Sequence, residues 1–198
     1  MNYLFHLYLS GDDPDLLTGN FMGDFVKGRL DDRFPPAIRA GIELHRAIDS
    51  FAHTDLHFNQ SRLRIAPSFG LYRGVLVDLF YDHFLAASWE HWSDEPLPHY
   101  LERVRDIVES RRVLLPGRLQ QLVPIIFADL IPSYLDPEGV GLALDRMSRR
   151  IRRPNPLARG GKELVLNYAG FREDFEEFLP DATRFALARH PLHESGAR

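Results

Sequence analysis

Apolar residues recur every three or four positions along nearly the whole chain, and Pro and Gly interrupt this pattern at intervals. The period predicts α-helices, and the interruptions predict the turns between them. The one candidate strand, Leu122 to Phe127, contains Pro124, which argues against it. With 198 residues, 44% of them hydrophobic, the chain can bury one sizeable core. We therefore expect an all-α, single-domain multi-helix bundle over residues 1–198, with a frayed tail from about residue 190.

The helix boundaries follow from proline positions and capping residues. Asp13 and Pro14 have the residue types of a helix cap and a first helical position, and Asp136 and Pro137 repeat this signal. The pattern predicts helices over residues 14–28, from 36 through at least 52, and over 71–92, 100–113, 119–130, 137–153 and 164–189. The aromatic stripe of the last helix is expected to lie in the core.

Composition excludes several classes of function. The chain has no cysteine, so disulfides, thiolate nucleophiles and cysteine-bound metals are excluded. No apolar stretch approaches the ~20 residues that span a bilayer, and the first six residues lack the basic start of a secretory signal. The net charge of −4 does not favour nucleic acid as a partner. We expect a cytoplasmic protein that binds neither membrane nor nucleic acid.

Three expected helices carry polar residues at positions where the periodicity places the core. In chain order the pairs are Asn20 and Asp24, His45 and Asp49, and Asp78 and Asp82. Residues three or four positions apart share a helix face, so each pair points the same way. Because burial of carboxylates is costly, a bound divalent cation would compensate for them. Imidazole with carboxylates and no sulfur suits Mn²⁺, Mg²⁺, Fe²⁺ or Zn²⁺.

The ligand candidates come from all three of these helices. The predicted metal ligands are Asp24, His45, Asp49 and Asp78, with Asp82 and His83 close by. His6 could join them from the N-terminal segment, but nothing in the local sequence sets its direction.

Ion pairs and hydrogen bonds are the alternative explanation for the same residues. His45 could be a hydrogen-bonded core histidine, and Asp49 could pair with Arg46. The remaining acids, Asp78 and Asp82, could be neutralised by Arg62, Arg64 or Arg73. Taken together, acids turned inward on three helices favour the metal site.

Several of these residues lie in motifs that resemble acyl carrier protein phosphodiesterases. The matching segments are residues 1–7 (MNYLFHL), 19–28 (GNFMGDFVKG), 34–36 (FPP), 41–49 (GIELHRAID), 78–85 (DLFYDHFL), 147–150 (MSRR) and 153–154 (RP). The resemblance covers most of the chain and is densest in the first 90 residues. It implies hydrolysis of the 4′-phosphopantetheine–serine phosphodiester of holo acyl carrier protein, which yields apo carrier protein and 4′-phosphopantetheine.

The resemblance also implies a cofactor and residue roles. It implies Mn²⁺ as the favoured metal, with Asp24, His45, Asp49 and Asp78 as its ligands. Asp82 or His83 would then orient the attacking water or protonate the leaving serine oxygen, and His83 is the better acid by its ordinary pKa. The family is similar to the HD-type metal phosphohydrolases, so an HD-like fold is expected. This chain has no His-Asp dipeptide, only the reversed Asp82-His83.

One basic segment stands out on this acidic chain. Residues 146–162 hold seven of the 24 basic residues and none of the 28 acidic ones. Acyl carrier proteins are strongly acidic, so this segment is predicted to dock the partner. The predicted contact residues are Arg146, Arg149, Arg150 and Arg153. The alternative is a solvated helix end whose charge complements the helix dipole.

Two other functions stay open on the sequence alone. One is an HD-like metal phosphohydrolase that acts on a nucleotide or another small phosphoester. The other is a helical binding module without catalytic activity, in which the inward acids form ion pairs.

Overall fold

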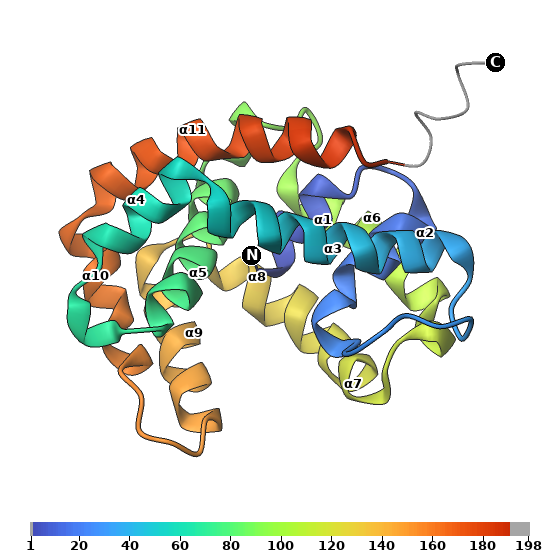
Figure 1. The fold of residues 1–198 in the computed structure, drawn as a ribbon, viewed down its shortest axis with the longest axis horizontal. Coiled ribbons are helices and arrows are strands. Elements are labelled where there is room, and N and C mark those ends of the chain that lie inside the picture. The colour runs from blue at the N-terminus through green and yellow to red at the C-terminus, as the bar shows by residue number, and fades with distance from the viewer. Residues whose placement is uncertain (1, 191–198) are drawn as a thin grey trace.

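Residues 2–190 are described by a computed structural model, and they form helices and turns without a strand (Figure 1). This confirms the predicted all-α class. The predicted tail beyond residue 190 lies outside the described residues. In chain order the helices are α1 (Tyr3–Leu9), α2 (Pro14–Phe21), α3 (Pro36–Thr54), α4 (Leu56–Arg64), α5 (Tyr72–Ala87), α6 (Leu97–Ser110), α7 (Gly117–Ile125), α8 (Ile131–Ser133), α9 (Pro137–Arg150), α10 (Gly160–Leu166) and α11 (Tyr168–Leu187). A π-helical segment, Ile126–Leu130, joins α7 to α8.

Local signals set several of these boundaries as predicted. The Asp13 side chain accepts hydrogen bonds from the first turn of α2, and the Asp136 side chain accepts one from Gly139 in α9. Both helices have proline at their start. The cap predictions are therefore confirmed at both positions.

Other boundaries differ from the predicted ones. Helix α2 ends at Phe21 rather than near residue 28, because the chain tightens into a 3₁₀ turn over Gly23–Phe25. The predicted last helix is interrupted at Asn167, between α10 and α11. Helix α1 was not predicted: it has seven residues and no side-chain cap of its own, so its stability comes from tertiary contacts.

An aromatic cluster of the core lies beneath α11. This helix runs along one long side of the molecule, with α3 and α4 next to it (Figure 1). Its residues Phe171, Phe175 and Phe178 are fully buried, as the sequence predicted. Phe175 and Phe178 contact Phe5 of α1, with ring centroids 6.4 and 5.7 Å apart. The same core therefore anchors the short first helix.

Helices α2 and α3 cross at two glycines. A Cβ on Gly19 would lie 2.2 Å from the Ile38 carbonyl oxygen, and one on Gly41 would lie 2.2 Å from the Leu16 carbonyl oxygen. Neither position can take a side chain without separating the helices. This close crossing brings Asn20 of α2 against α3, where the functional site is built.

Candidate metal centre

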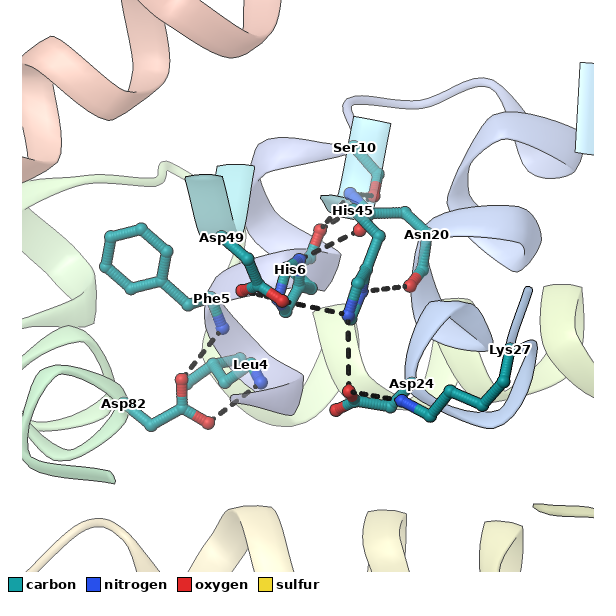
Figure 2. Close-up of polar contacts among 10 residues, drawn as sticks. All are labelled: Leu4, Phe5, His6, Ser10, Asn20, Asp24, Lys27, His45, Asp49 and Asp82. Carbon is teal, nitrogen blue, oxygen red and sulfur yellow. Dashed lines mark hydrogen bonds and ion pairs between the residues drawn. The ribbon is translucent and has the colours of Figure 1, made fainter. Parts of the chain in front are cut away.

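Two buried imidazoles from different helices stack face to face. His6 of α1 and His45 of α3 have ring centroids 3.8 Å apart and planes 13° apart (Figure 2). Both side chains are almost completely buried. Two histidines would repel each other if both were charged, so the arrangement needs a reason beyond packing.

Asn20 sets the tautomer of both rings. His45 Nδ1 donates to the Asn20 backbone carbonyl at 2.9 Å, because a carbonyl can only accept. The Asn20 side-chain nitrogen donates to the His6 carbonyl at 3.0 Å and to Ser10 Oγ at 2.8 Å. The Asn20 side-chain oxygen must therefore accept the hydrogen bond from His6 Nδ1, at 2.9 Å. For each ring in its neutral form, the lone pair is then on Nε2.

The two Nε2 atoms face one carboxylate. His6 Nε2 lies 3.3 Å from one Asp49 oxygen, and His45 Nε2 lies 3.4 Å from the other (Figure 2). Neither Nε2 has a hydrogen-bond partner among residues 2–190, although both are buried. The ligand atoms of His6, His45 and Asp49 all lie within 4.8 Å of one another. Lone pairs and a carboxylate turned to one point form a group that could hold a metal ion.

Asp24 approaches the same histidine from the 3₁₀ turn after α2. Its Oδ1 atom lies 3.6 Å from His45 Nε2. The same oxygen lies 3.8 Å from Nζ of Lys27, which is exposed. Gly23 makes this approach possible, because a Cβ there would overlap the His45 ring at 2.2 Å. Asp24 therefore extends the carboxylate side of the group.

A cavity of about 150 Å³ opens beside this group. Its lining includes Asp24, Asp49 and Asp78, three of the four predicted ligands. His53, which is not among the ligands predicted from the sequence, lines it as well. His53 follows Asp49 by four positions on α3, so the same helical spacing that pairs His45 with Asp49 could have indicated it. The structure thus brings all four predicted ligands to one place and adds His6 and His53.

The protonation states favour cation binding. Burial and the neighbouring His45 together lower the pKa of His6 to about 4, so His6 is neutral at neutral pH. Burial by itself would raise the pKa of Asp49, but the adjacent His6 imidazole outweighs burial and holds the pKa below its usual range. The adjacent His45 imidazole lowers the pKa of Asp24. Burial raises the pKa of Asp78, which makes it the carboxyl of the cavity that most readily holds a proton.

Asp82 contacts backbone rather than the histidine group. Its two carboxylate oxygens accept hydrogen bonds from the backbone N–H groups of Leu4 and Phe5, both at 3.0 Å (Figure 2). Asp82 of α5 thereby caps the start of α1 from another helix. Burial raises the pKa of Asp82 to about 7. The contact holds the turn of α1 that carries His6.

His83 uses both ring nitrogens away from the cavity. Its Nδ1 donates to the Tyr134 carbonyl at 2.7 Å, and its Nε2 is hydrogen-bonded to the Tyr168 hydroxyl at 2.9 Å. Burial lowers the pKa of His83. These contacts tie α5 to α11 and to the end of α8.

The ion pairs that could have explained the inward acids are not formed as supposed. Arg64 pairs with Asp174 at 2.8 Å, and Arg46 donates to the carbonyls of Val26 and Gly28 at 2.9 Å. Asp24 and Asp49 lie against histidines instead, and Asp82 accepts from backbone N–H groups.

Metal binding should be visible as stabilisation. Mn²⁺ at about 100 times its dissociation constant is expected to raise the free energy of unfolding by about 2.7 kcal/mol. For a chain of this size that corresponds to a Tm increase of roughly 5–10 °C. His45→Ala should remove the increase, since one Nε2 ligand is lost, whereas His99→Ala on the exposed face of α6 should retain it. Equal Tm increases in both variants, measured by calorimetry, would count against the centre.

Comparison with known proteins decides the family. Residues 1–182 match the family described as acyl carrier protein phosphodiesterase. The chain belongs to this family. Relatives that bear its name include proteins of Photorhabdus laumondii (28% identical, 91% of this chain and 92% of the relative), Pectobacterium atrosepticum (30%, 94% and 97%) and Serratia proteamaculans (29%, 91% and 94%). The resemblance seen in the sequence is therefore confirmed. No solved structure matches the chain, and the HD-like fold stays a prediction.

None of the described helices is long and apolar enough to cross a membrane.

Proposed function

We propose that the chain is a metal-dependent phosphodiesterase that releases 4′-phosphopantetheine from holo acyl carrier protein. Membership of the acyl carrier protein phosphodiesterase family supports the reaction and the substrate. The observation that carries the metal dependence is the pair of buried Nε2 atoms, of His6 and His45, that face Asp49 without hydrogen-bond partners.

The proposed ligands are His6, His45, Asp49 and Asp24. Two imidazoles and two carboxylates suit Mn²⁺, Fe²⁺ or Zn²⁺, and family resemblance favours Mn²⁺. Such a cation supplies Lewis-acid stabilisation of a phosphoryl group and lowers the pKa of water. Asn20 fixes the direction of both rings, and its mutation is expected to weaken metal affinity by about 10–100-fold.

Side chains of the protein would supply the proton that the leaving group needs. The serine oxygen of the carrier protein leaves and needs a proton. Asp78 faces the cavity, and burial favours its protonated form, so we assign it this donation. A ligand role for Asp78, as predicted from the sequence, is the alternative. Asp82 is assigned to positioning, because it holds the turn that carries His6. Proton transfer by His83 stays a prediction, and its hydrogen bonds favour a structural role.

The partner follows from the same assignment. Holo acyl carrier protein would approach the basic end of α9, where Arg149 and Arg153 are exposed. A location in the cytoplasm stays the prediction made from the sequence.

The test is release of 4′-phosphopantetheine from holo carrier protein by Mn²⁺-loaded protein. A panel of nucleotides and small phosphoesters serves as the comparison. We expect hydrolysis of the carrier protein and little of the panel, with activity lost in EDTA. Hydrolysis of nucleotides with none of the carrier protein would replace the proposal by the small-phosphoester alternative. Absence of both activities with a metal-free protein would favour a binding module.

A further inference from the structure

A second hollow shares Asp24 with the metal cavity. It is a groove of about 220 Å³, and Asp24 and Tyr3 form part of its lining. Since Asp24 also lines the 150 Å³ cavity, the two hollows meet at this residue. A ligand that reacts at the metal centre can therefore extend into the groove.

The far wall of the groove is apolar. It is formed by the end of α7 and the π-helical segment on one side and by α9 on the other. The wall residues are Leu122, Ile125, Ile126, Leu130, Ala143 and Met147. π-Helical segments are rare and are often found at functional sites. Ile125 is 44% exposed, whereas Ile126 and Ala143 are buried, so the wall is open to solvent at Ile125 and continues into the core.

Two arginines of α9 also line the groove. Arg146 and Arg150 are four positions apart and therefore share one helix face. Among residues 2–190, Arg149 pairs with Asp145 at 2.7 Å, whereas neither Arg146 nor Arg150 forms an ion pair. The arginines predicted to dock the partner therefore fall into different places. Arg146 and Arg150 line the groove, whereas Arg149 does not line it and pairs with Asp145.

The groove also offers neutral hydrogen-bonding groups. The Asn2 side chain donates to the Tyr134 hydroxyl at 2.7 Å, and both residues line the groove. Burial and the charge of Asp24 raise the pKa of Tyr3 to about 12, while the charge of Arg150 acts in the opposite direction. Tyr3 is therefore a neutral O–H group in the same groove lining as Asp24 and Arg150.

We propose that this groove holds the phosphopantetheine arm of the substrate, with Arg146 and Arg150 at its phosphate. The inference rests on the proposed function and adds the residues that bind the arm. The arm begins with a phosphate, continues with a branched dimethyl carbon, and ends beyond two amides. The groove lining offers a partner for each of these parts: arginines and Tyr3 for the phosphate, the apolar wall for the dimethyl carbon, and the Asn2–Tyr134 pair for an amide. Guanidinium groups bind phosphate with strong charge-assisted hydrogen bonds.

The test measures binding of the free arm by calorimetry. 4′-Phosphopantetheine is titrated into the full chain with Mn²⁺ and again in EDTA, and pantetheine, which lacks the phosphate, is titrated in parallel. Arg150→Ala and Arg146→Ala should each weaken 4′-phosphopantetheine binding by about 10–100-fold, the usual worth of a charged hydrogen bond. Pantetheine binding should not change. Arg149→Ala is the matched control and should leave both affinities unchanged.

A second variant tests the apolar wall. Ile125→Asp places a charge on an exposed position of the wall, so the fold should survive. It should weaken binding of both ligands, because both carry the apolar body of the arm. The groove assignment is overturned if wild-type protein binds neither ligand, or if Arg150→Ala and Arg149→Ala bind the arm equally. It is also overturned if Ile125→Asp binds both ligands as the wild type does.

Failure of this inference is separable from failure of the proposed function. If wild-type protein releases 4′-phosphopantetheine from holo carrier protein but the arginine variants bind the arm normally, only the groove assignment fails. If wild-type protein does not hydrolyse holo carrier protein, the proposed function fails, whatever the binding experiment shows.

Discussion

Asp49→Asn is expected to lower kcat/KM for holo carrier protein by on the order of 10³-fold, about 4 kcal/mol of transition-state stabilisation. The Asp49 carboxylate lies 3.3 Å from His6 Nε2 and 3.4 Å from His45 Nε2, so it is the shared centre of the candidate metal site. Asparagine keeps the shape but removes the charge. The side chain is 35% exposed, so folding should persist. Hydrolysis rate and bound Mn²⁺, measured by elemental analysis, should fall together.

Glu43→Gln is the matched control for this change. Glu43 is an exposed acid on the same helix, α3, and it does not line the metal cavity. Its loss should leave metal content and kcat/KM unchanged. Full metal content and full activity in Asp49→Asn would exclude the proposed centre.

Asp82→Ala is expected to lower the free energy of unfolding by about 3 kcal/mol, since two buried backbone N–H groups lose their acceptor at about 1–3 kcal/mol each. The groups are those of Leu4 and Phe5, at the start of a helix that has no cap of its own. His6 lies in the same turn, so Mn²⁺ affinity should fall with stability. Urea unfolding, with and without Mn²⁺, measures both effects.

Asp136→Ala is the comparison for Asp82→Ala. Asp136 caps α9 from an exposed position by accepting from Gly139. Removal of an exposed cap should cost about 1 kcal/mol and leave Mn²⁺ affinity unchanged. If the two variants lose equal stability and Asp82→Ala binds Mn²⁺ normally, Asp82 does not position His6.

The pH dependence of stability should carry the signature of Asp82. Burial raises its pKa to about 7, so between the pKa of the unfolded chain and pH 7 the folded protein binds a proton that the unfolded chain does not. The contribution of Asp82 to the free energy of unfolding is therefore largest at low pH and decreases as the pH rises through 7. Asp82→Asn, which cannot ionise, should lack this decrease. The free energy of unfolding is measured for Asp82→Asn and for wild type across pH 4–8. Because His6 titrates in both proteins, the difference between the two curves reports Asp82 alone.

The ligands of the proposed centre come from elements that are distant in sequence, and a few contacts hold them together. Asn20 holds both imidazoles, and Gly19 beside it allows α2 to approach α3. Gly23 leaves room for the His45 ring. A side chain at either glycine would shift a ring or a carboxylate, so the geometry of the site depends on positions that could never bind a metal.

The sequence by itself determined the helical class and which residues lie near the site. Periodicity and caps act within one helix, so Asp13 and Asp136 could be identified as caps from neighbours alone. The shared face of two acids also follows from spacing within a helix, and Asp49 and Asp78 do line one cavity. Asp24 lines it too, but from the 3₁₀ turn after α2 and not from the predicted helix face.

Only the tertiary structure decided which groups meet. Helix α1 is too short to be stable alone and is held by Asp82 from α5, so no local pattern could place His6 opposite His45. Likewise, the sequence placed Arg149 and Arg150 in one basic patch, whereas the pairing with Asp145 and the groove separate them. Spacing specifies the face of a helix, but the partner of that face depends on contacts between residues that are far apart in the chain.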